Sequence, residues 1–122
     1  MAHILVIEED EFFLEMLPQM LLLDNHQVSL LKDGAQALAW LDGNRPDLIL
    51  TDILMPNMDG VELIMKLSKL SNNTPLVAMS GGRRSITSAF NLESAKLLGV
   101  KHTLTKPFTQ AALRDALREA LA

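Results

Sequence analysis

Chemically useful side chains follow several short apolar runs of this sequence, at the point where each run ends. They are carboxylates, one hydroxyl and one ammonium, and the set is Glu8, Glu9, Asp52, Ser80 and Lys106. Ligands bind at the carboxyl ends of the strands in open α/β sheets, and buried parallel strands read as continuous apolar runs. Asp52 directly follows the run Leu48–Thr51, so it is the most informative residue of the chain.

Together these groups predict a site for a hard cation and a phosphoryl group. Closely packed carboxylates repel one another unless a cation lies among them. Oxygen ligands with few carboxylates favour Mg²⁺, which keeps several waters. Lys106 and Ser80 could each bind one phosphate oxygen, and Asp52 could be the nucleophile that accepts the phosphoryl group. Each residue alone also fits a turn, a cap or a solvated loop, but their joint occurrence at four strand ends favours the site.

Five apolar runs alternate with five helical patterns, and these elements must position the site. Strands are expected at Ile4–Ile7, Val28–Leu31, Leu48–Thr51, Leu76–Met79 and Thr103–Leu104. Helices are expected at 11–24, 34–42, 60–70, 86–98 and 109–121, with Thr109 as an N-cap and Asn25 as a C-terminal stop. Strict alternation with right-handed crossovers predicts a parallel sheet between helices, so the strand ends meet at one edge.

Composition predicts one globular domain over residues 1–122, with no output domain. The chain is 48% hydrophobic, and its net charge of −4 disfavours direct binding to nucleic acid or to an anionic membrane. It has no cysteine, so we expect neither disulfides nor a thiolate metal site. The N-terminus does not resemble a signal peptide and no apolar stretch is long enough for a membrane span, so we expect a cytoplasmic protein.

Four blocks of sequence resemble the receiver domain of bacterial two-component response regulators. The blocks are Ile4–Glu9, Asp47–Asp52 with Met55–Gly60, Val77–Gly81 and Thr105–Phe108. The resemblance covers essentially the whole chain. It implies a flavodoxin-like, doubly wound (βα)5 fold of the α/β class, with a five-stranded parallel sheet in the order 2-1-3-4-5.

The resemblance implies that Asp52 is the phosphoacceptor and lies in a Mg²⁺ site. Glu8 and Glu9 would be the acidic metal pair, and the backbone carbonyl of Leu54 would be a further ligand. The family usually has Asp where this chain has Glu9, and the extra methylene moves the carboxylate by about 1.5 Å. Asp10, one residue beyond the usual pair, could partly compensate.

The resemblance also implies how a phosphoryl group would be bound and sensed. Ser80 and Lys106 would contact the phosphoryl group, and the Lys106–Pro107 peptide bond would be cis. Ser80 would also carry the switch, together with Thr103, which stands where the family has a switch aromatic residue.

The implied partners are a sensor histidine kinase or histidine phosphotransfer protein and an unknown downstream protein. The downstream protein would read the face made by the fourth helix, fifth strand and fifth helix. The chain would not be an enzyme toward other substrates, because it would catalyse only its own phosphoryl acceptance and dephosphorylation.

Three other readings compete with this one. A pseudo-receiver, which binds partners without phosphorylation, is motivated by Glu9 and Thr103. An aspartate-nucleophile phosphatase of the haloacid-dehalogenase type is disfavoured, because Leu54 stands where that chemistry needs a second Asp. Dinucleotide binding is disfavoured because acidic residues 8–10 replace a Gly-rich phosphate loop.

Overall fold

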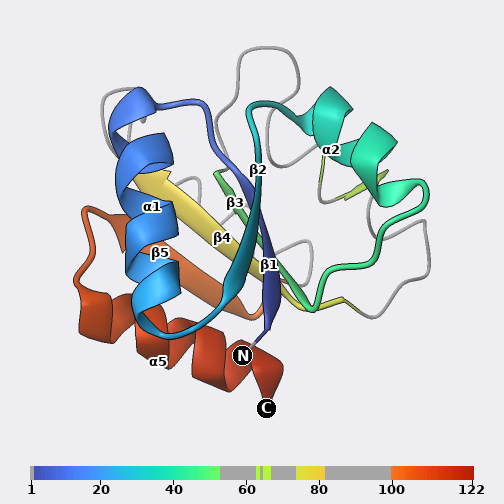
Figure 1. The fold of residues 1–122 in the computed structure, drawn as a ribbon. Helices are drawn as coiled ribbons and strands as arrows, with labels where there is room; N and C mark the ends of the chain where they lie inside the picture. The colour runs from blue at the N-terminus through green and yellow to red at the C-terminus, as the bar shows by residue number, and fades with distance from the viewer. Residues whose placement is uncertain (1, 53–62, 64, 67–73, 82–99) are drawn as a thin grey trace.

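The described residues form one parallel sheet flanked by helices. The computed structural model describes residues 2–52, 63, 65, 66, 74–81 and 100–122, with no side-chain description for 80 and 81. The strands are β1 (His3–Ile7), β2 (Gln27–Leu31), β3 (Leu48–Asp52), β4 (Leu76–Gly81) and β5 (His102–Lys106). Their order is β2-β1-β3-β4-β5 and every neighbouring pair is parallel (Figure 1). The predicted fold class and strand order are confirmed.

Three helices are described: α1 (Glu11–Leu23), α2 (Gly34–Leu41) and α5 (Gln110–Leu121). The predicted boundaries of these three differ from the observed ones by one residue at most. Residues 63, 65 and 66 are helical, in agreement with the helix expected at 60–70, whereas the helix expected at 86–98 lies outside the described residues. None of the described helices is long and apolar enough to cross a bilayer.

Local side-chain chemistry sets where the helices begin and end. The Asp10 carboxylate accepts a hydrogen bond from the backbone N–H of Phe12 and caps α1. Thr109 caps α5 in the same way through the N–H of Ala112, as its sequence position predicted. Asn25 has a φ of 64°, the left-handed conformation that terminates helices, so its predicted role as a stop is confirmed.

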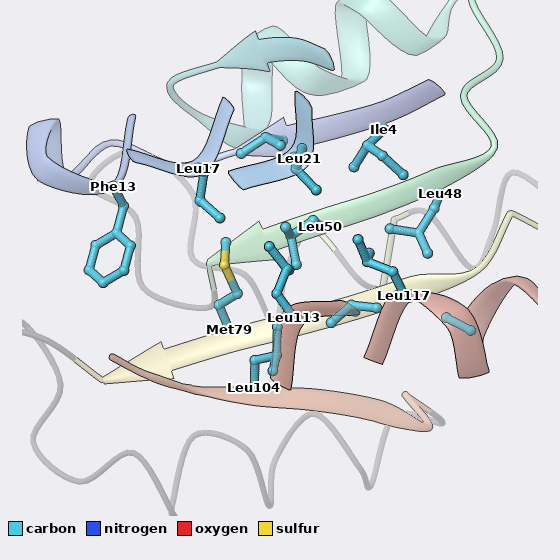
Figure 2. Close-up of a cluster of buried hydrophobic side chains, with 13 residues drawn as sticks. Ile4, Phe13, Leu17, Leu21, Leu48, Leu50, Met79, Leu104, Leu113 and Leu117 are labelled. Carbon is cyan, nitrogen blue, oxygen red and sulfur yellow. The ribbon is translucent and has the colours of Figure 1, made fainter. Parts of the chain in front are cut away.

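The sheet separates two hydrophobic layers. Strand residues two apart face the same layer, so Ile4 and Val6 pack with α1 and α5, whereas Leu5 and Ile7 pack with α2 and Leu63. Figure 2 shows the first layer, in which α1 and α5 side chains meet those of the strands. This alternation explains why the strands read as continuous apolar runs.

All five strands extend further than the sequence predicted, β1, β2 and β3 by one residue and the other two by more. β4 continues to Gly81, and β5 runs from His102 to Lys106 although only Thr103–Leu104 was expected. The prediction followed apolar residues alone, whereas polar residues also pair in the ladder; Ser80 pairs with Thr105 and Gly81 with Lys106. Lys106 is therefore part of a strand, where neighbouring backbone fixes the origin of its side chain.

Candidate functional site

Three charged residues converge at the carboxyl edge of the sheet. Glu8, Asp52 and Lys106 each come two residues after a strand residue of the α1–α5 layer. Because side chains two apart share a face, all three extend from the side of the sheet that α1 and α5 cover. All three are buried, with exposed fractions of 0%, 6% and 6%.

Lys106 joins the two carboxylates. Its Nζ donates to Glu8 Oε2 at 2.5 Å and to Asp52 Oδ2 at 3.1 Å. The partners lie 98 and 54 residues away in sequence, so only the folded sheet brings them together. The convergence expected from the strand ends is therefore observed for these three residues.

Glu8 is held from both sides of its carboxylate. Oε1 accepts hydrogen bonds from the backbone N–H groups of Glu9 and Asp10, at 3.1 and 3.0 Å. The pKa of Glu8 is raised from 4.5 to about 7, mainly by burial and also by repulsion from Asp52. The attraction of Lys106 opposes both effects and is outweighed. The cluster thus places two buried acids beside one ammonium, and Glu8 keeps its proton up to about pH 7.

This donor set fits a hard divalent cation. The converging ligands are carboxylate oxygens, and a bound cation would favour the charged form of both acids. Within the described ranges, no three acidic or histidine side chains are arranged to hold a metal ion. Glu8 and Asp52 would therefore hold Mg²⁺ together with waters or backbone oxygens, as this ion commonly requires.

The neighbouring acids differ from what the sequence suggested. Asp10, expected as a possible substitute for Glu9, has its carboxylate engaged in capping α1. Glu9 is half-buried beside Glu8, and its role as a metal ligand stays a prediction. Leu54, whose carbonyl was the further expected ligand, lies outside the described residues.

The structure places the backbone of the two expected switch residues, Ser80 and Thr103, in strands β4 and β5. Ser80 lies in β4 at the carboxyl edge, but its side chain is outside the description. Thr103 is half-buried in β5 and pairs with Ala78, so its role as a switch also stays a prediction. The Lys106–Pro107 peptide bond is cis, as the resemblance implied.

An aromatic cluster beside Lys106 was missed at the level of sequence. The Lys106 Nζ lies 4.4 Å from the centroid of the Phe13 ring. Phe13 in turn contacts Phe12 edge to face and Phe108 at a tilt. Phe13, Leu17 and Leu21 have the spacing of one buried helix face, and Phe13 lies in the first turn after the acids. That combination was the available signal that its ring belongs near the site.

Comparison with known proteins identifies the class that this fold and site define. The sequence profile of the family described as "Response regulator receiver domain" matches residues 4–118. The chain belongs to this family, the receiver domains of two-component response regulators.

Individual relatives agree with this membership. The chain is 32% identical over 120 residues to the transcriptional regulatory protein CseB of Streptomyces avermitilis, covering 98% of this chain and 49% of that protein. Chemotaxis protein CheY4 of Vibrio cholerae is 27% identical with a TM-score of 0.83, and 99% of both chains is covered.

A third relative is the receiver domain of the sensor histidine kinase PA1611 from Pseudomonas aeruginosa PAO1. It is 25% identical with a TM-score of 0.86, covering 98% of this chain and 97% of that one. That domain was crystallised with a magnesium ion coordinated in its active-site cleft. The chain thus resembles receivers from regulators and kinases alike, and it spans about half the length of CseB.

Proposed function

We propose that this receiver domain accepts a phosphoryl group on Asp52 and signals through protein–protein contact. The observation that carries the proposal is the buried contact of Lys106 Nζ with Asp52 Oδ2, at 3.1 Å, at the end of β3. An ammonium in this place can neutralise a phosphate oxygen next to the acceptor. The donor is a histidine kinase or histidine phosphotransfer protein, and the setting is the cytoplasm.

The chemistry follows from the residues of the cluster. An Asp52 oxygen attacks phosphorus in line; the new O–P bond forms as the P–N bond to the donor imidazole breaks, and its electron pair returns to the ring nitrogen. Lys106 stabilises negative charge on the transferring group. Mg²⁺, when bound by Glu8 and Asp52, supplies positive charge beside the two carboxylates. Glu9, Leu54 and Ser80 complete the site in this proposal.

Phosphorylation would change the charge at the site and, through the domain, the surface that a partner protein binds. The acyl phosphate adds about −1.5 to −2 charge beside Glu8 and Lys106. We propose that Ser80 and Thr103 respond to this charge and that a downstream protein reads the face that includes β5 and α5. The chain catalyses only its own phosphoryl acceptance and the later hydrolysis.

Intact-mass spectrometry with acetyl phosphate and Mg²⁺ tests the proposal. The wild type should gain one phosphoryl group and Asp52→Asn should gain none. Asp115→Asn is the matched control, because Asp115 is an exposed acid on α5, and it should behave as the wild type. An equal gain in Asp52→Asn would reject the assignment. No gain in a folded wild type at millimolar Mg²⁺ would instead favour a receiver fold that binds without phosphate.

A further inference from the structure

We propose that Phe13 is a positioning residue whose ring holds the Lys106 ammonium beside Asp52. The observation is the 4.4 Å distance between Lys106 Nζ and the ring centroid. A cation within about 6 Å of a ring face is attracted by the quadrupole of the ring. The inference rests on the proposed function only for the role of Lys106 in phosphoryl transfer, whereas the placement of the ammonium can be measured without it.

The Lys106 ammonium has three N–H groups, and the two carboxylates accept hydrogen bonds from two of them. These carboxylates belong to Glu8 and Asp52, and the centroid of the Phe13 ring lies 4.4 Å from the same nitrogen. The Lys106 side chain is 2% exposed, so water does little to weaken the attraction. Cation–π attraction is stronger for such a desolvated pair than at an exposed site.

The ring is itself fixed, as a positioning group must be. Phe13 is 5% exposed, and Figure 2 shows it at the arrowhead end of β3 and β4. Its centroid lies 5.9 Å from that of Phe108, with 36° between the planes, and 5.3 Å from that of Phe12, at 89°. These are ordinary distances for packed aromatic pairs. The ring therefore has little freedom to follow the lysine if the lysine moves.

One short segment supplies two of the groups around the ammonium. Glu8 and Phe13 are five residues apart, and the Asp10 cap that starts α1 lies between them. A cation bound by Glu8 and Asp52 would compete with Lys106 for these carboxylates, but it would not compete for the ring. The ring is thus a contact that stays available to the ammonium when the carboxylates are engaged by a cation. An aliphatic residue would fill the space without this attraction.

Fluorinated phenylalanines inserted site-specifically at position 13 test the inference. Successive fluorines weaken the quadrupole while nearly preserving ring shape, so folding should survive. Without any phosphodonor, ¹⁵N relaxation should show the Lys106 ammonium becoming more mobile with each fluorine. With acetyl phosphate and Mg²⁺, the phosphorylation rate constant should fall by about fivefold for the most fluorinated ring, and further for Phe13→Leu.

The same series at Phe12 is the matched control. Phe12 has the same ring on the same helix and contacts Phe13, but it is 63% exposed. Fluorination there should leave both readouts unchanged. Equal effects at the two positions, or an unchanged ammonium mobility at position 13, would overturn the positioning role. If the wild type is never phosphorylated, the proposed function fails, but the ammonium measurement still decides the role of Phe13.

Discussion

Each end of α1 carries a cluster of acidic and basic side chains at similar distances, but one cluster is buried and the other is exposed to solvent. At the beginning of the helix, Lys106 lies 3.1 Å from Asp52 inside the protein, with Glu8 as a second acid. At the other end, Arg114 lies 3.1 Å from Asp24, with side chains 52% and 22% exposed. Burial raises the pKa of Glu8 to about 7, whereas the hydrogen bond from Arg114 lowers the pKa of Asp24.

The difference shows that distance alone does not decide what an ion pair does. Asp24 receives both Arg114 Nε and Nη2, and Gln110 adds hydrogen bonds to Asp24 and to the Met20 carbonyl. Its charge is matched and solvated, so this cluster only joins α1 to α5. The buried cluster places two acids beside one ammonium, and Glu8 keeps its proton to a higher pH than an ordinary carboxyl does. This cluster is therefore the one suited to taking up a cation or a phosphoryl group.

Removing the Lys106 ammonium from the buried cluster should lower the free energy of unfolding more than any other change considered. Lys106→Met retains most of the apolar side chain but leaves Glu8 and Asp52 buried together without their ammonium. We expect the free energy of unfolding to fall by about 3 kcal/mol at about pH 8, measured by urea denaturation without metal. The loss should be smaller at about pH 5, where Glu8 holds a proton.

Arg114→Met is the matched comparison at the solvated end of the helix. It removes a cation from an acid at the same distance, but water can solvate the remaining Asp24. The free energy of unfolding should fall clearly less in Arg114→Met than in Lys106→Met. Equal losses in the two variants would show that burial does not separate the clusters.

Neutralising Glu8 should change how stability depends on pH. The native state holds the Glu8 proton up to about pH 7, whereas an ordinary carboxyl of this type has a pKa of 4.5. Between these values the native state binds more protons than the unfolded state, so the contribution of Glu8 to stability falls as pH rises. In Glu8→Gln this loss, about 2 to 3 kcal/mol, should be absent.

The check is a pair of unfolding curves for each protein, at about pH 5 and about pH 8, without divalent metal. The wild type should lose more stability between them than Glu8→Gln does. Millimolar Mg²⁺ should reduce the difference, because a bound cation favours the charged form of Glu8. Parallel behaviour of the two proteins would mean that Glu8 is already charged at low pH.

The strand ends explain how much of this site the sequence could predict. Apolar runs and their alternation with helical patterns were enough to place Glu8, Asp52 and Lys106 on one edge. That edge follows from the parallel sheet and needs no detailed packing. The Asp10 cap had a local signal too, an acid directly before a helical pattern, but Asp10 was considered only as a partial substitute for Glu9.

Other contacts depend on packing that no local pattern encodes. Which carboxylate Lys106 approaches more closely depends on the register of β5 and on the path of its long side chain. The Phe13 ring meets the ammonium because α1 has a particular rotation over the sheet. The Asp24–Arg114 pair joins residues 90 apart and depends on how α5 lies against α1. These are tertiary consequences of the whole fold.

The contribution of Asp24 to stability should depend on pH in the opposite direction to that of Glu8. It should also be the smallest of the stability effects predicted for Lys106, Glu8 and Asp24. Because its pKa is lowered below 3.8, Asp24 stabilises the fold above that value, and this contribution is lost as pH falls through the lowered pKa. Asp24→Asn should therefore melt slightly below the wild type near neutral pH and together with it in strong acid. High salt should also remove the difference, since exposed pairs are screened. A difference in melting temperature that persists in high salt would mean that Asp24 acts through its hydrogen bonds with Gln110 and Arg114. The exposed ion pair would then resist screening, as the buried one does, in spite of its greater exposure.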